Sequence, residues 1–185
     1  TFAAKPGSLV ALVGHSGAGK TTLTYLIPRL YDAASGSVKI DGHDVRHIKL
    51  ESLAKLVGVV TQETYLVHDT VRENLRYGNP DATDDELWDA LEIAQADDFV
   101  RAMPEGLDAP ITQGGTNVSG GQRQRLAIAR AVVRRPEIYL FDDSFSALDL
   151  ATDARLRAAL KPVTADATVV IVAQRVSTIR DADLI

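Results

Sequence analysis

Two kinds of segment, which differ in the spacing of their apolar residues, alternate along much of this chain. Short runs of large apolar side chains are typical of buried strands, and they occupy residues 9–13, 57–61, 138–142 and 168–173. Segments in which apolar residues recur every three or four positions are typical of helices, and they occupy residues 22–30, 50–56 and 152–160. Strands that alternate with helices predict an α/β fold with a mainly parallel sheet flanked by helices.

Two further features modify this α/β pattern. Residues 37–40 and 43–45 are extended in character on either side of the turn dipeptide Asp41-Gly42, so we expect a small antiparallel β part. The stretch from residue 62 to 136 is more polar, with helices predicted at 70–77, 84–95, 97–103 and 122–134. We interpret it as an α-helical subdomain inserted into a core lobe of residues 1–61 and 137–185, all within a single domain.

Composition narrows the class of protein. With 185 residues, of which 45% are hydrophobic and 24% charged, the chain can bury the core of one domain. Its formal net charge of −5 argues against broad binding to nucleic acid, and the lack of cysteine excludes disulfides and thiol chemistry. No apolar run approaches the length of a membrane span, so we expect a soluble segment, with both ends trimmed relative to a longer domain.

The chain contains a complete phosphate-loop motif, G-x-x-x-x-G-K-S/T, which reads Gly14-His15-Ser16-Gly17-Ala18-Gly19-Lys20-Thr21. The motif lies between a predicted strand and a predicted helix, the context in which such a loop binds phosphate. Its glycines allow a tight turn whose N–H groups point at a polyphosphate, and the next helix presents its positive end to the same anion. Lys20 is expected to bind the terminal phosphates and Thr21 to bind Mg²⁺. The alternative, a glycine-rich surface turn, does not explain the full match.

A carboxylate ends the strand predicted at residues 138–142. Asp142 lies at the carboxyl end of that strand, which is where open α/β sheets bind their ligands. We expect Asp142 to hold Mg²⁺ opposite Thr21. An aspartate at a strand end is often only a turn former, but together with a phosphate loop it indicates a nucleotide site. Asp143 comes next and is expected beside the γ-phosphate.

A second glycine-rich anion site precedes the helix predicted at residues 122–134. It reads Val118-Ser119-Gly120-Gly121-Gln122, in which Ser119 is a good helix N-cap and the glycines leave N–H groups accessible to a phosphate. An ordinary capped helix start would explain Ser-Gly-Gly alone. Two phosphate-binding helix starts in one domain cannot easily reach one nucleotide. We therefore interpret the second as serving a neighbouring molecule.

Taken together, these motifs resemble the nucleotide-binding domain of ATP-binding cassette (ABC) transporters. The resemblance covers nearly the whole chain and rests on the phosphate loop, the Q-loop residue Gln62, the signature at 118–122, the Walker B run ending at Asp142, and the D-loop at 146–149. Residues 70–75 and 114–117 are similar to the exporters of this family. The resemblance implies a P-loop NTPase core, with ATP and Mg²⁺ as cofactors.

The resemblance also implies an assembly. Two such domains form a head-to-tail dimer, in which each ATP lies between the phosphate loop of one chain and the signature of the other. A transmembrane domain, expected to be fused upstream, places them at the cytoplasmic face of the cell membrane, and no nucleic acid takes part. The residues implied at the metal are Thr21, Gln62 and Asp142, and Gln62 also reports nucleotide state to the membrane domain. The residues implied to bind ATP are Gly14, His15, Ser16, Gly17, Ala18, Gly19, Lys20, Thr21, Thr22, Ser119, Gly120, Gly121 and Gln122, with His15 acting through its backbone.

The chain departs from the family pattern at two positions implied to be catalytic together with Gln62. The family usually has a glutamate after the Walker B aspartate as general base, whereas this chain has Asp143, whose side chain is shorter by about 1.5 Å. The family usually has a histidine after the last strand, whereas this chain has Gln174, an amide that donates a hydrogen bond but carries no charge. Both changes predict slow hydrolysis at the chain's own site.

An intact signature in a chain with a weakened site favours one half of a heterodimeric exporter, because this signature then completes a competent site on a different partner. The alternative is that both substitutions are neutral in a working homodimer.

Two other function classes stay open. One is a soluble ABC ATPase of DNA repair or the ribosome, although long coiled-coil insertions and basic arms are missing, and the other is a regulatory nucleotide-binding module without turnover. The aromatic residue that stacks on adenine in the family is expected before Thr1.

Overall fold

The computed structural model describes residues 1–172 and 179–185, which divide into two compact units. The first unit comprises Thr1–Val59, Pro136–Asp143 and Asp166–Ile185. The second comprises Val60–Arg135 and Ser144–Ala165. These bounds differ from the lobes expected from the sequence, because Ser144–Ala165 is grouped with the second unit and not with the core lobe.

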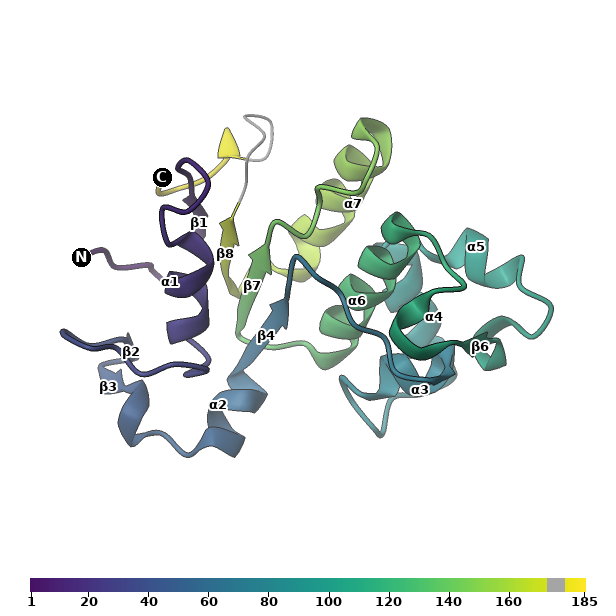
Figure 1. The fold of residues 1–185 in the computed structure, drawn as a ribbon, viewed down its shortest axis with the longest axis horizontal. Coiled ribbons are helices and arrows are strands. Elements are labelled where there is room, and N and C mark those ends of the chain that lie inside the picture. Colours follow the sequence, from purple (N-terminus) through teal and green to yellow (C-terminus); the bar gives the residue numbers. More distant parts are fainter. Residues whose placement is uncertain (173–178) are drawn as a thin grey trace. The chain divides into compact units, whose positions relative to one another are not determined.

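A four-stranded sheet organises the described part of the first unit (Figure 1). Its strand order is β1-β8-β7-β4, and the strands span Leu9–Leu12 (β1), Thr168–Val172 (β8), Ile138–Asp142 (β7) and Val57–Val60 (β4). The central strand β8 is parallel to both neighbours, with Val170 opposite Val10 on one side and opposite Leu140 on the other. This order places the carboxyl ends of β1, β7 and β8 along one edge of the sheet.

Aliphatic side chains from the sheet form the core of the first unit. Val10, Leu140 and Val170 lie on three adjacent strands, each is at most 3% exposed, and they pack with Leu53 and Val45. Complete burial of each such side chain contributes about 1.5–3 kcal/mol. The same unit contains the helices α1 (Lys20–Leu26) and α2 (Leu50–Leu56), the hairpin strands β2 (Lys39–Ile40) and β3 (His43–Asp44), and a 3₁₀ turn at Val45–His47.

The second unit is mainly helical. Its helices are α3 (Val71–Arg76), α4 (Asp84–Ile93), α5 (Asp97–Arg101), α6 (Gly120–Arg134) and α7 (Leu150–Val163), and its short antiparallel strands are β5 (Asp69–Thr70) and β6 (Pro110–Ile111). Two 3₁₀ turns lie at Gly106–Asp108 and Gln113–Gly115. The longest helix of this unit, α6, packs against α3 and α4, and its side chains Leu126 and Ile128 are fully buried (Figure 1).

Polar side chains mark where four of the five helices of the second unit begin, α5 being the exception. Thr70, Thr83, Ser119 and Asp149 each accept a hydrogen bond from a main-chain N–H of the first turn of α3, α4, α6 and α7, respectively. A cap of this kind stabilises a helix by about 1 kcal/mol. The fold class predicted from the sequence is confirmed: a parallel sheet with helices, a small antiparallel part and a helical region. Within residues 1–172 and 179–185, no helix has the length and apolar character needed to cross a membrane.

Candidate nucleotide site

The phosphate loop joins β1 to α1 in the first unit, as the motif predicts (Figure 1). Gly17 and Gly19 have φ angles of +78° and +86°, a left-handed conformation that side chains with a Cβ rarely adopt. Nothing lies within 4 Å of a Cβ built at either glycine, so backbone conformation, and not crowding, requires glycine here. Gly19 is also the N-cap of α1, and because it has no side chain, no capping group covers the first N–H groups of that helix.

Lys20 is held against its own loop. Its Nζ donates hydrogen bonds to the carbonyl oxygens of Gly14 at 2.8 Å and His15 at 2.9 Å. These bonds keep the ammonium group over the curve of the loop, where a triphosphate would bring its terminal oxygens. Hydrogen bonds from an ammonium group to phosphate are stronger than those to neutral carbonyls, so Lys20 is suited to exchange these partners for phosphate.

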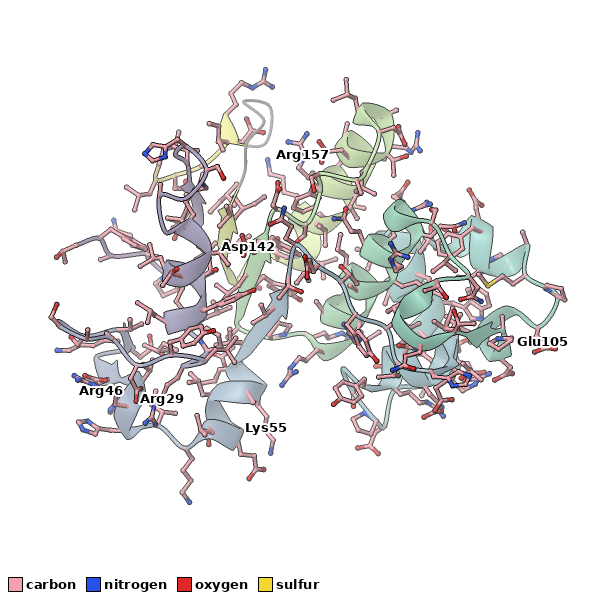
Figure 2. The ribbon with its side chains drawn as sticks, in the orientation of Figure 1. Arg29, Arg46, Lys55, Glu105, Asp142 and Arg157 are labelled. Atoms are coloured by element: carbon pink, nitrogen blue, oxygen red, sulfur yellow. The ribbon has the colours of Figure 1, made fainter. Side chains whose placement is uncertain are left out.

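Thr21 and Asp142 meet although 121 positions separate them in the sequence. Thr21 lies in the first turn of α1, and its Oγ1 donates to Oδ1 of Asp142 at 3.1 Å. Asp142 is the last residue of β7 and is 1% exposed (Figure 2). A hydroxyl and a carboxylate are hard oxygen ligands, and Mg²⁺ in nucleotide sites typically binds one or two such groups together with phosphates and water. The donor set therefore fits Mg²⁺.

Asp143 follows directly and has an unusual backbone. Its φ angle is +49°, a left-handed conformation that aspartate tolerates better than most residues with a side chain. Its N–H donates to the carbonyl oxygen of Val172 at 3.1 Å, which ties the residue to the end of β8. The position from which its carboxylate projects is therefore fixed by the sheet.

Three other site residues are predicted from the sequence, namely Thr22, Gln62 and Gln174. Thr22 is exposed in the first turn of α1, next to the loop. Gln62 is exposed just after β4 and belongs to the second unit, so its role at the metal stays a prediction. Gln174 lies outside the described residues, and its role also stays a prediction.

The signature segment forms the start of α6 in the second unit. Ser119 Oγ accepts a hydrogen bond from the Gln122 N–H at 3.2 Å, and Gln122 Oε1 accepts one from the Ser119 N–H at 2.8 Å. This reciprocal pair is a capping box, which fixes Ser119 at the helix end. A hydroxyl that accepts one hydrogen bond still has its own proton to donate. The exposed Ser119 therefore keeps a proton that it can donate to an external acceptor without giving up its cap.

Sequence reasoning missed two buried polar residues near these motifs. Ser144 is fully buried, and its hydroxyl donates to the Val60 carbonyl oxygen at 2.7 Å. Gln124 is 5% exposed, and its Oε1 accepts a hydrogen bond from the Ala147 N–H at 3.2 Å. The sequence contains one signal that points to Gln124. This residue lies on the otherwise apolar face of α6, where an unpaired amide would be costly.

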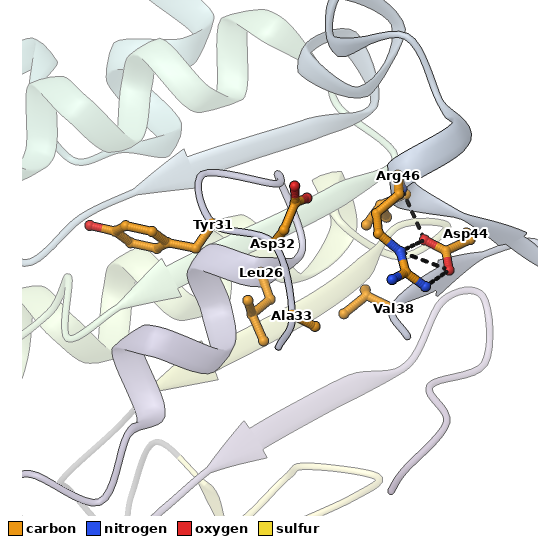
Figure 3. A pocket seen from close by; sticks show the side chains of 8 residues that line it. Leu26, Tyr31, Asp32, Ala33, Val38, Asp44 and Arg46 are labelled. Atoms are coloured by element: carbon orange, nitrogen blue, oxygen red, sulfur yellow. Dashed lines mark hydrogen bonds and ion pairs between the residues drawn. The ribbon is translucent and has the colours of Figure 1, made fainter. Parts of the chain in front are cut away.

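A small hollow elsewhere in the first unit has no comparable chemistry (Figure 3). Leu26 and Val38 line it, and its charged edge is formed by Asp44 and Arg46, whose Oδ2 and Nη2 atoms lie 2.7 Å apart. The hydrogen bonds from Arg46 hold the pKa of the Asp44 carboxyl well below its ordinary value. Because these charges satisfy each other, we assign this hollow no ligand.

The loop between β1 and α1, with Thr21 and Asp142 meeting beside it, defines a P-loop nucleotide-binding protein. Comparison with family models makes the class more specific. Residues 1–146 match the model described as ABC transporter. The chain therefore belongs to the ABC transporter family, as a nucleotide-binding domain.

Individual relatives agree with this assignment. The chain is 53% identical over 186 residues to an uncharacterized ABC transporter ATP-binding protein of Mycobacterium tuberculosis, covering 99% of this chain and 32% of that protein. It is 45% identical over 181 residues to an ATP-dependent lipid A-core flippase of Syntrophus aciditrophicus, and the match covers 98% of this chain and 30% of that protein. The structure of a bacterial Atm1-family ABC exporter with ATP bound matches with a TM-score of 0.93 and 41% identity. The match covers 96% of this chain and 31% of the exporter chain.

These matches confirm the expected similarity to exporters. They also show that the chain spans about a third of the length of these relatives. The greater length of the relatives is consistent with fusion of such a domain to a transmembrane domain.

Proposed function

We propose that the chain binds and hydrolyses ATP as the nucleotide-binding domain of an exporter-type ABC transporter, at the cytoplasmic face of the membrane. A transmembrane domain fused upstream and a second nucleotide-binding domain, arranged head to tail, complete the proposed assembly. Family membership, exporter relatives and the greater length of those relatives support the proposal.

Residues of the first unit have distinct proposed roles at the nucleotide site. The loop N–H groups and Lys20 bind the phosphates, and Thr21 and Asp142 hold Mg²⁺, with Gln62 as a further proposed ligand. Mg²⁺ bound there neutralises charge on the phosphate oxygens. The carboxylate of Asp143 is the proposed acceptor of the proton from the attacking water.

We further propose that this site hydrolyses ATP slowly, and the constrained position of Asp143 is the observation that carries this part. The shorter side chain could reach the water only if its backbone moved closer. Such a movement would strain or break the hydrogen bond between the Asp143 N–H and the Val172 carbonyl. Gln174, in place of the histidine usual in the family, weakens contact with the same γ-phosphate further.

The signature is proposed to act on a different nucleotide. The exposed Ser119 and the first N–H groups of α6 are suited to the γ-phosphate of an ATP held by the partner. The combination of a weakened own site with a competent signature supports a heterodimer. In such an assembly ATP is held for long periods by this chain and is hydrolysed faster at the partner's phosphate loop.

Two variants of the chain in its native assembly test this division. Lys20→Ala is expected to weaken ATP binding at the chain's own site, because it removes the charge that meets the terminal phosphates. Ser119→Ala is expected to leave that binding unchanged but to lower total turnover at least tenfold, since loss of one transition-state donor costs about 10²–10³ in rate. The measurements are ATP binding and phosphate release.

The composition of the assembly tests the heterodimer separately. Mass spectrometry of the purified native assembly is expected to find a second, different nucleotide-binding chain with glutamate after its Walker B aspartate. A homodimer with full turnover at both sites would contradict the heterodimer while leaving the ATPase proposal intact. Normal turnover in Ser119→Ala would contradict the proposed role of the signature.

A further inference from the structure

The first turns of α6 are in close contact with the D-loop, residues 146–149, through Ala147. Gln124 Oε1 accepts a hydrogen bond from the Ala147 N–H at 3.2 Å. Gly121 faces the same residue, because a Cβ built there would lie 3.2 Å from the Ala147 carbonyl oxygen. Gly120 approaches the Ala147 side chain, with 3.9 Å between its built Cβ and that of Ala147. Both polar groups of the Ala147 main chain therefore face α6.

Helix geometry explains why these three residues act together. Positions three and four apart lie on one face of a helix, so Gly120, Gly121 and Gln124 share the face that meets Ala147. Glycine at 121 permits the close approach, and the long Gln124 side chain spans the remaining distance to the N–H. Because Gln124 is 5% exposed, its hydrogen bond to Ala147 is largely protected from water.

The D-loop is held at both ends as well. Ahead of it, the buried Ser144 hydroxyl is bonded to the Val60 carbonyl oxygen at 2.7 Å. At its other end, Asp149 caps α7 by accepting hydrogen bonds from the N–H groups of Ala151 and Thr152. Between these ends, the hydrogen bond from Ala147 fixes the middle of the loop to the signature helix.

We propose that Gln124 is a positioning residue that keeps the signature Ser119 and the D-loop in one fixed arrangement. This inference rests on the proposed function, in which Ser119 binds a nucleotide held by the partner. Five helical positions separate Ser119 from Gln124, roughly 7.5 Å along the axis, so the bond to Ala147 acts within the same rigid helix end. A misplacement of about 1 Å at a reacting group can cost about 10²-fold in rate.

The test compares Gln124→Met with Gln124→Glu in the native assembly. Methionine matches the length of glutamine but has no oxygen to accept the Ala147 N–H, whereas glutamate retains that acceptor. Gln95→Met is the matched control, because the Gln95 Oε1 also accepts a hydrogen bond in the second unit, from Arg155 at 3.2 Å, and Arg155 lies on α7, outside the D-loop. The measurements are kcat and KM for MgATP, hydrogen exchange at the Ala147 amide, and the thermal midpoint.

The inference predicts that Gln124→Met lowers kcat at least tenfold with KM within twofold of the unmodified protein, and that the Ala147 amide exchanges faster. Gln124→Glu is expected to recover most of kcat, and Gln95→Met to keep it. An unchanged kcat in Gln124→Met would overturn the inference. So would a parallel loss of kcat, MgATP binding and thermal midpoint, or a failure of glutamate to restore the rate in a folded protein.

The two levels of proposal fail in different ways. If the unmodified assembly shows no MgATP turnover, the proposed function is overturned and the inference with it. If Ser119→Ala changes nothing, the proposed role of the signature is overturned, and the inference falls with that role. If the unmodified assembly and Ser119→Ala behave as expected while Gln124→Met is normal, the inference alone is overturned.

Discussion

Lengthening Asp143 by one methylene group tests whether reach limits hydrolysis at the chain's own site. Suppose that a glutamate carboxylate at this position lies about 2.8 Å from the attacking water. Shortening the side chain by about 1.5 Å increases that distance to about 4.3 Å, which is beyond hydrogen-bond distance. The Asp143 N–H bond to Val172, at 3.1 Å, opposes a compensating backbone shift. General-base catalysis contributes about 10²–10⁴ in rate, so Asp143→Glu should recover at least about tenfold, or about 1.4 kcal/mol of barrier.

The same substitution is expected to reduce stability. The φ angle of +49° suits aspartate, whose short polar side chain tolerates the left-handed region, whereas glutamate is less favoured there. A left-handed conformation costs an ordinary residue about 1–2 kcal/mol, so a loss of about 1 kcal/mol in the free energy of unfolding is expected. Higher turnover combined with lower stability distinguishes a gain in reach from a general improvement of the fold.

The assay is single-turnover conversion of bound ATP to ADP, in an assembly whose partner chain has a disabled phosphate loop. Only ATP held by this chain is then measured. Asp143→Asn is the matched control, because asparagine keeps the size and the left-handed preference but has no basic carboxylate. Equal rates for aspartate and glutamate, with ATP binding unchanged, would refute the argument that reach is limiting.

Two further predictions concern the stability of the second unit. Gly78→Ala should destabilise it by about 1–3 kcal/mol in chemical denaturation, because the new Cβ would lie 2.3 Å from the Arg130 carbonyl oxygen, and an unchanged midpoint would contradict this packing. Arg72→Met should lower stability at pH 7, because Arg72 forms ion pairs with Asp84 and Asp108 and its hydrogen bond lowers the pKa of Asp108. A carboxyl pKa that is lower in the folded than in the unfolded protein stabilises the fold at pH values above the unfolded pKa of about 3.9. That contribution is lost as the pH falls, so the difference in stability between Arg72→Met and the unmodified protein should shrink below about pH 4. A difference that stays constant with pH would show that the ion pairs are not its cause.

Local sequence signals predicted most of the fold, and tertiary contacts account for the differences. The helix expected at residues 22–30 is shorter, Lys20–Leu26, since the left-handed Gly19 ends the loop two positions earlier and Pro28 has no N–H to continue the helix. Helix α6 begins at Gly120 and not at residue 122. Glycine has a low helix propensity, but here the Ser119 cap and the close approach to Ala147 outweigh that propensity.

The phosphate loop and its metal pair could be predicted because each is defined by a motif. The loop is a continuous segment, and the Thr21–Asp142 contact follows from joining that loop to a strand-ending carboxylate. The left-handed backbone of Asp143 could not be predicted, since it depends on a hydrogen bond to Val172 across the sheet. Gln124 was missed for a similar reason, because its partner is the main chain of a distant loop.

The chain passes between its two units at four points, and two of them adjoin proposed nucleotide contacts. These two lie between Val59 and Val60 and between Asp143 and Ser144. On the second-unit side, Ser144 and Val60 are joined by a buried hydrogen bond of 2.7 Å, and such a bond contributes about 1 kcal/mol. Because Ser144 directly follows Asp143 and Val60 lies two positions before Gln62, this one bond fixes the main chain next to both residues on the second-unit side.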